Sequence, residues 1–229
     1  MTAPAAGYPP LRAVLFDNDG TLVDSERLCN LALQQQFAGY GVELPLAELL
    51  AHYRGGRLHD IFSRLCAAHQ LNLPADYETE YRARLQQLFA AQLRPVEGAT
   101  ALLQQLQQQG LTLAVVSNGP QSKMRFTLEH CGLLPFFAAN SQPAEQALFS
   151  AYDCGLFKPD PALYLHAAAA LGVAPKQCII VEDSLPGVQA GLAAGIRTFF
   201  LNHYQEACPP DAIELSGLPD LIPALRQLF

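Results

Sequence analysis

The chain has 229 residues, half of them hydrophobic, and a formal net charge of −7. This length supports a substantial buried core, and the acidic balance without a dense Lys or Arg run argues against a nucleic-acid-binding surface. The stretch MTAPAAGYPP lacks a basic start followed by an apolar segment, and no eighteen consecutive residues are apolar, so neither secretion nor membrane insertion is expected.

Six cysteines are spread along the chain without a C-x-x-C pair or the paired spacing of a zinc site. The sequence therefore predicts reduced thiols and a cytoplasmic protein. These cysteines are Cys29, Cys66, Cys131, Cys154, Cys178 and Cys208.

The first predicted element is a strand, AVLF at residues 13–16, and the part of the chain that follows has a different character. It contains successive stretches with helical spacing and no convincing strand. This part ends at Arg94-Pro95, where proline disfavours helix at the residue before it. We therefore expect an α-helical cap domain at 24–94, inserted into a core formed by 1–23 and 95–229.

After the insert, almost continuously apolar segments alternate with stretches of helical spacing that end in glycine. Continuous apolar character is typical of strands that are covered on both faces of a parallel sheet. The alternation predicts an α/β fold with a doubly wound, Rossmann-like parallel sheet. The predicted strands are 111–118, 177–183, 197–202 and a weaker one at 148–153, and the predicted helices are 99–110, 121–132, 159–172 and 185–195.

Polar side chains follow several predicted strands, beginning with Asp17 and Asp19 after residues 13–16. Since the ligand crevice of an open α/β sheet lies beyond the carboxyl ends of its strands, these groups are expected at one edge. Carboxylates held so close repel one another, and a divalent cation relieves that repulsion. Oxygen-only ligands favour Mg²⁺, which also binds substrate phosphate. The other members of this group are Ser117, Asn118, Lys158, Glu182 and Asp183.

The order of these residues resembles the four motifs of the haloacid dehalogenase superfamily phosphatases. The resemblance lies in D-x-D-G-T after the first strand, Ser117 after the second, Lys158 ahead of P-D-P, and E-D after a later strand. It implies a phosphomonoester hydrolase in which Asp17 is the nucleophile and Asp19 the general acid and base.

The same resemblance implies roles for the other groups at this edge. Ser117 and Lys158 would hold phosphoryl oxygens, and backbone amides at Asn118, where the next helix opens, would assist. Mg²⁺ would be bound by Asp17, Asp183 and the backbone carbonyl of Asp19, with Glu182 as an additional or outer ligand.

The position of the helical insert matches that of the small cap in this superfamily, which closes over the crevice and selects small substrates. Arg54, Gly55, Gly56 and Arg57 form its most suggestive stretch, either as substrate-binding residues or as ordinary surface charges. The segment 139–147 is longer than the family pattern predicts.

Resemblance to bacterial small-cap members implies a small phosphate ester as partner, such as a sugar phosphate or the sugar-acid phosphate 6-phosphogluconate. A β-phosphoglucomutase-type phosphotransferase and a phosphoglycolate phosphatase remain alternatives. No nucleic acid or membrane partner is expected, and the chain is expected to be a monomer.

Two interpretations from other classes remain open, a phosphate-binding protein without turnover and a calcium-binding module. A calcium loop would use Asp17, Asp19 and Glu26 as ligands and Gly20 as the required glycine. Leu15 would then occupy the first ligand position, and a strand would precede the loop in place of a helix, which argues against this reading.

Overall fold

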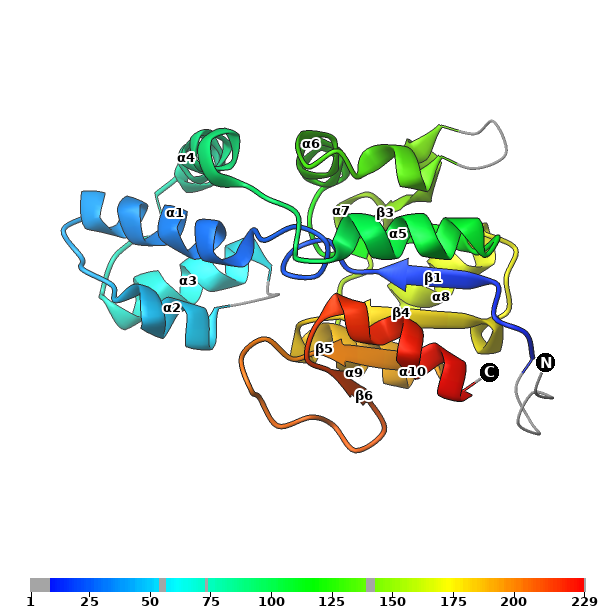
Figure 1. Cartoon of the computed structure of the whole chain (residues 1–229). Coiled ribbons are helices and arrows are strands. Elements are labelled where there is room, and N and C mark those ends of the chain that lie inside the picture. Colours follow the sequence, from blue (N-terminus) through cyan, green and yellow to red (C-terminus); the bar gives the residue numbers. More distant parts are fainter. Residues whose placement is uncertain (1–8, 54–56, 73, 139–142, 229) are drawn as a thin grey trace. The chain divides into compact units, whose positions relative to one another are not determined.

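The computed structural model describes residues 9–53, 57–72, 74–138 and 143–228. The chain divides into two compact units, one made of Met1–Val23 and Pro95–Phe229 and the other of Asp24–Arg94 (Figure 1). Val23 and Pro95 pair in an antiparallel bridge, so the chain leaves the first unit and returns to it at neighbouring points.

The first unit contains, within its described residues, a sheet of six parallel strands in the order β3-β2-β1-β4-β5-β6. From β1 the chain proceeds outward on one side through β2 and β3, and then on the other side through β4 to β6. The expected doubly wound α/β fold is confirmed, and its topological switch point lies between β1 and β4. The strands are β1 (Ala13–Phe16), β2 (Thr112–Ser117), β3 (Leu148–Ser150), β4 (Cys178–Glu182), β5 (Arg197–Leu201) and β6 (Ile213–Leu215).

Helices cover both faces of this sheet, which explains why its central strands are apolar throughout. α5 (Ala99–Gln108) and α10 (Leu221–Leu228) lie on one face, and α8 (Ala162–Ala170) and α9 (Leu185–Ala193) lie on the other (Figure 1). Every residue of β1 and β4 is buried. The remaining elements are α6 (Gln121–His130), α7 (Ala151–Cys154) and the 3-10 turns Leu134–Phe137, Ala144–Ala147, Pro175–Gln177 and Leu218–Asp220.

The structure differs from the sequence prediction at two strands. The strand predicted at 148–153 ends at Ser150, because the Ser150 hydroxyl accepts hydrogen bonds from the backbone N–H groups of Tyr152 and Asp153 and caps α7. The edge strand β6 was not predicted. Only three residues long, it has Glu214 exposed at its centre and therefore lacks an apolar run.

The pairing of β1 with β2 and β4 brings the carboxyl ends of these strands to the same edge of the sheet. Phe16 pairs with Val115 on β2 and with Val181 on β4. The backbone N–H of Asp17 donates to the carbonyl oxygen of Val181 at 3.0 Å, which extends the ladder by one residue. Asp17 and Glu182 are consequently neighbours at the carboxyl edge of the sheet.

The second unit is helical in its described part. An aromatic cluster joins three of its helices, with the Phe62 ring centroid 5.5 Å from that of Phe37, 4.7 Å from that of Tyr77 and 5.8 Å from that of Tyr81. Such aromatic pairs stabilise a small core beyond their buried area. The helices are α1 (Glu26–Gly39), α2 (Leu46–His52), α3 (Leu58–Ala68) and α4 (Tyr77–Gln92).

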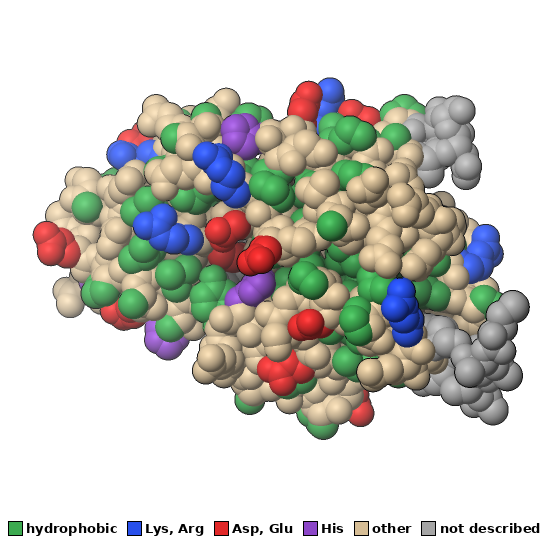
Figure 2. All heavy atoms as spheres, in the orientation of Figure 1, with side chains coloured by type: hydrophobic (Ala, Val, Ile, Leu, Met, Phe, Trp, Pro, Cys, Tyr) green, Lys and Arg blue, Asp and Glu red, His purple; other side chains and the backbone are tan. Residues whose placement is uncertain are grey.

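Surface charge, cysteine pairing and helix hydrophobicity follow from the structure. On the face drawn in Figure 2, the described Lys and Arg side chains are interspersed with other residue types. All six cysteines are free thiols. None of the helices in the described ranges is long and apolar enough to cross a membrane.

Candidate active site

Lys158 lies between two carboxylates at the switch point of the sheet. Its Nζ donates to Asp17 Oδ1 at 2.7 Å and to Glu182 Oε1 at 2.6 Å. The lysine is only 5% exposed, and Glu182 is completely buried. Three residues that sequence analysis placed at one edge are therefore in direct contact.

Glu182 serves as an anchor for its neighbours. In addition to Lys158, its carboxylate accepts hydrogen bonds from the Tyr164 hydroxyl at 3.2 Å and from the backbone N–H and hydroxyl of Ser184, both at 2.9 Å. Gly187, in the first turn of α9, leaves room for this arrangement, because a Cβ there would collide with the Glu182 carboxylate. Both oxygens of Glu182 are thus engaged in holding the site together.

Asp183, the next residue, is held by the loop that follows β1. The Thr21 hydroxyl donates to Asp183 Oδ1 at 3.0 Å. Gly20 has a φ of +80°, and a Cβ at this position would overlap the Asp183 carboxylate. The glycine of D-x-D-G-T therefore supplies both a left-handed turn and a close approach that a larger residue would prevent.

Asp17, Glu182 and Asp183 could together hold a metal ion. Each offers a carboxylate oxygen, and these atoms all lie within 4.8 Å of one another. An oxygen-only, anionic donor set suits Mg²⁺. The residues present therefore fit the cation that the sequence analysis expected, and the ligand role of the Asp19 backbone carbonyl stays a prediction.

The side chain of Asp19 has a different partner. Its Oδ1 lies 2.8 Å from Lys123 Nζ, and both side chains are mostly buried. Ser117, at the end of β2, is 2% exposed, and its Oγ accepts from the backbone N–H of Gly119 at 3.0 Å. Asp19 and Ser117 are thus both placed by contacts with the β2 to α6 region.

Asn118 clamps the segment that carries Lys158. Its Oδ1 accepts from the Lys158 backbone N–H at 2.9 Å, and its Nδ2 donates to the Lys158 carbonyl oxygen at 3.2 Å. The side chain therefore positions Lys158, and the expected role of backbone amides at Asn118 in phosphate binding stays a prediction.

The buried charges shift the pKa values of this cluster. Burial, together with the negative charges of Glu182 and Asp19, raises the pKa of Asp17 to about 7, although Lys158 opposes the change. Burial alone would lower the pKa of Lys158, but Asp17 and Glu182 outweigh it and raise that pKa well above its ordinary value. Lys158 therefore stays charged, and a cation beside Asp17 would favour the ionised carboxylate.

The balance of charges also favours a divalent cation. Among the described residues named above, the carboxylates of Asp17, Asp19, Glu182 and Asp183 face the two ammonium groups of Lys123 and Lys158. With all of these groups ionised the cluster carries two excess negative charges. A dianionic phosphate would be repelled unless further positive charge were present.

The residues predicted for substrate binding belong to the helical part of the sequence. Arg54, Gly55 and Gly56 lie outside the described residues, as do residues 139–142 of the longer segment. Arg57 is exposed and immediately precedes α3. Its expected role in substrate selection stays a prediction.

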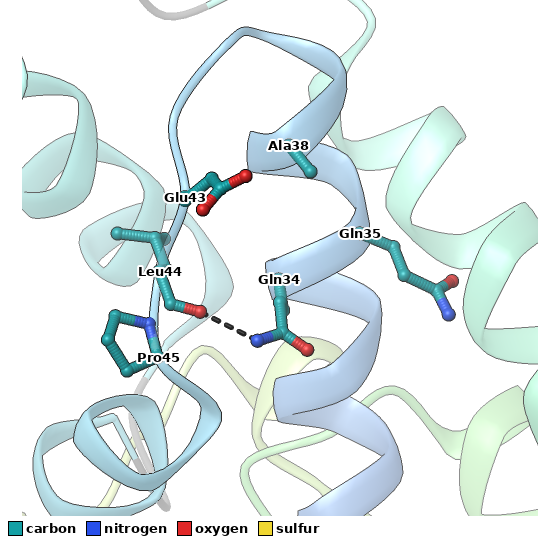
Figure 3. A pocket seen from close by; sticks show the side chains of 6 residues that line it. All are labelled: Gln34, Gln35, Ala38, Glu43, Leu44 and Pro45. Carbon is teal, nitrogen blue, oxygen red and sulfur yellow. Dashed lines mark hydrogen bonds between the residues drawn. The ribbon is translucent and has the colours of Figure 1, made fainter.

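A pocket of about 550 Å³ occurs in the helical unit (Figure 3). It is lined by residues of α1 and by the segment before α2, where Gln34 Nε2 donates to the Leu44 carbonyl oxygen at 2.7 Å. The side chain of Gln35 extends to the other side of α1 (Figure 3). A single carboxylate and two amides do not form a catalytic group, so we assign this pocket no chemistry. Its lining residues are Gln34, Gln35, Ala38, Glu43, Leu44 and Pro45.

Sequence reasoning did not identify four residues of this cluster. Thr21 belongs to D-x-D-G-T itself and could have been read as a partner of a carboxylate. Tyr164 lies on the buried side of α8, and Ser184 is the N-cap of α9. Lys123 carries no local signal, because its contact with Asp19 depends on how α6 meets the loop after β1.

Comparison with known proteins shows the family to which the chain belongs. The family model for haloacid dehalogenase-like hydrolases matches residues 11–195. The chain is 38% identical over 218 residues to 6-phosphogluconate phosphatase from Escherichia coli K12, covering 92% of this chain and 94% of that protein. It is 30% identical over 220 residues to hexitol phosphatase A of the same organism, covering 95% of this chain and 93% of that protein.

A solved structure is similar along almost its whole length. This HAD family hydrolase from Deinococcus radiodurans R1, with bound phosphate and sodium, has a TM-score of 0.75 and 29% identity, and the match covers 96% of both chains. The expected superfamily and hydrolase class are confirmed. The chain belongs to the haloacid dehalogenase-like hydrolase family.

Proposed function

We propose that this hydrolase is a Mg²⁺-dependent phosphatase that removes phosphate from a small sugar phosphate or sugar-acid phosphate, of which 6-phosphogluconate is the first candidate. The observation that carries the proposal is the contact of Lys158 with Asp17, beside a group of carboxylates that can share one cation. The names of the two curated relatives support a phosphate ester of a sugar derivative as substrate.

In the first step, an Asp17 carboxylate oxygen attacks phosphorus while the bond from phosphorus to the substrate oxygen breaks. Asp19 donates a proton to the leaving oxygen, which departs as an alcohol. The product on the enzyme is an aspartyl-phosphate at Asp17. Lys158 would hold a phosphoryl oxygen, and the 2.7 Å distance from its ammonium to the attacking carboxylate supports this role.

In the second step, water attacks phosphorus as Asp19 accepts its proton, and the bond from phosphorus to Asp17 breaks to release inorganic phosphate. The hydroxyl of Ser117, at the end of β2, would donate to another phosphoryl oxygen. When bound, Mg²⁺ would supply positive charge for the phosphoryl oxygens and reduce their repulsion by the carboxylates.

The proposal is tested by phosphate release from a panel of phosphorylated metabolites in the presence of Mg²⁺. The panel contains 6-phosphogluconate, glucose 6-phosphate, a hexitol phosphate, phosphoglycolate and β-glucose 1-phosphate. We expect turnover of one or more sugar derivatives and a preference for 6-phosphogluconate. A preference for phosphoglycolate would overturn the sugar assignment, and conversion of β-glucose 1-phosphate without phosphate release would indicate a phosphotransferase.

A further inference from the structure

Lys123 is a second, partly buried cation of the site, separate from Lys158. It lies in the first turn of α6, and its Nζ is 2.8 Å from Asp19 Oδ1. The lysine side chain is 18% exposed and that of the aspartate 14%. An ion pair so shielded from water fixes the direction of a carboxylate more firmly than an exposed pair does.

The backbone between β2 and α6 lies beside this contact. A Cβ at Gly119 would stand 3.3 Å from Ser117 Oγ, 3.6 Å from Lys123 Cδ and 3.8 Å from Asp19 Oδ2. The three groups therefore converge around Gly119, where a Cβ would be tight only against Ser117 Oγ. Lys123, in α6, and Ser117, at the end of β2, thus flank the same short connection beside Asp19.

The two lysines serve different carboxylates. Lys158 is held by Asp17 and Glu182, on the side where phosphorus would be attacked. Lys123 contacts Asp19, the proposed proton donor to the leaving oxygen. A positively charged partner stabilises the carboxylate that forms when Asp19 gives its proton to the leaving oxygen, and it does so without touching the phosphoryl group.

We infer that Lys123 is a positioning residue, which orients the Asp19 carboxyl toward the leaving oxygen of the substrate. This inference rests on the proposed function of Asp19 as general acid. Loss of Lys123 should then slow esters with poor leaving groups, which need protonation, much more than activated aryl esters, which need little. The effect should fall on kcat and leave KM nearly unchanged.

The test compares Lys123→Met and Lys123→Arg with the unaltered protein, using 4-nitrophenyl phosphate and an alkyl phosphate that the protein hydrolyses. Because general acid catalysis contributes about 100-fold or more, we expect Lys123→Met to lose about tenfold or more in kcat on the alkyl ester and clearly less on the aryl ester. Lys123→Arg keeps the positive charge and should recover part of the loss. If kcat falls equally for both esters, or if only KM rises, Lys123 binds the phosphoryl group and the inference is wrong.

Arg125→Met is the matched control, because it removes another cation of α6. The partner of Arg125 is Glu145, which lies outside the carboxylate cluster. The variant's ratio of alkyl to aryl activity should equal that of the unaltered protein. A change in this ratio as large as that in Lys123→Met would assign the effect to α6 in general and overturn the inference.

Asp19→Ala separates this inference from the proposed function. If Asp19→Ala slows both esters equally, the acid role of Asp19 is wrong. If it slows the alkyl ester selectively but Lys123→Met does not, only the inference about Lys123 fails. In the double variant Asp19→Ala with Lys123→Met, no further selective loss is expected, because there is no longer a carboxyl to position.

Discussion

The ammonium of Lys158 lies 4.9 Å from the ring centroid of Tyr164, and the hydroxyl of this tyrosine donates to Glu182, the carboxylate that also binds Lys158. Tyr164 therefore supports the lysine in two ways, with its ring face and through a shared anion. Burial raises the pKa of Tyr164 well above its ordinary value, so its hydroxyl remains a donor.

Tyr164→Phe should keep the ring beneath Lys158 and remove only the hydrogen bond to Glu182. Loss of a hydrogen bond to a charged group should lower the free energy of unfolding by about 1.5–3 kcal/mol. Urea denaturation measures this change, and Tyr152→Phe serves as control because Tyr152 is exposed. Equal stability of Tyr164→Phe and the unaltered protein would argue against the anchoring role.

Mg²⁺ should stabilise the folded protein through the carboxylate group. At a Mg²⁺ concentration 100 times the dissociation constant, binding raises the free energy of unfolding by about 2.7 kcal/mol. Asp183→Asn removes one anionic ligand and should reduce this gain, whereas Asp211→Asn, an exposed position, should keep it. Thermal denaturation with Mg²⁺ and with EDTA measures the gain, and an unchanged response of Asp183→Asn would place the cation elsewhere.

Without Mg²⁺, the stability of the protein should depend on pH through Asp17. Its pKa is about 7 in the folded protein against 3.8 ordinarily, so the folded state retains a proton that the unfolded chain releases. The stabilisation is complete below about pH 4 and is lost as the pH rises through 7. A rise from 3.8 to about 7 corresponds to about 4 kcal/mol.

Asp17→Asn is neutral at every pH and lacks this dependence. Urea denaturation in EDTA should therefore show Asp17→Asn gaining on the unaltered protein by up to about 4 kcal/mol between pH 4 and pH 8. Mg²⁺ should diminish the difference, because a cation stabilises ionised Asp17. Parallel pH profiles of the two proteins would mean that the surroundings of Asp17 do not disfavour its charge.

Arg54 or Arg57 should select the acid end of the substrate, because a guanidinium can bind a carboxylate through two hydrogen bonds. We expect Arg54→Ala or Arg57→Ala to lower the ratio of kcat/KM for 6-phosphogluconate to that for glucose 6-phosphate by about 10- to 150-fold, the equivalent of about 1.5–3 kcal/mol. Arg82→Ala is the control, since Arg82 pairs with Glu78 on α4. An unchanged ratio in both variants would exclude this stretch as the selective element.

The fold and the central carboxylates could be predicted because their signals are local. β1 and β4 are apolar and buried throughout, so the sequence marks where each ends and which residue follows it. Parallel strands bring those ends to one edge, which is why Asp17 and Glu182 could be expected together. The glycine of D-x-D-G-T likewise predicts a turn, although its close approach to Asp183 is visible only in the structure.

The parts that could not be predicted depend on contacts distant in the sequence. Helical spacing indicates that Tyr164 is buried, but not that its hydroxyl meets Glu182. Lys123 looks like an ordinary surface residue of α6, and only the approach of the loop after β1 gives it Asp19 as a partner. Asn118 could be placed at the end of β2, but its clamp on the Lys158 backbone spans forty residues.

The proposed mechanism requires that Asp17 carry the phosphoryl group during turnover. Its most direct test is an acid quench of the Mg²⁺-loaded protein during hydrolysis of a substrate with radiolabelled phosphate, followed by peptide mapping. We expect label on the peptide that contains Asp17, release of that label by hydroxylamine as for an acyl phosphate, and no label in Asp17→Asn. Steady turnover in Asp17→Asn, or label of equal amount on that variant, would contradict it.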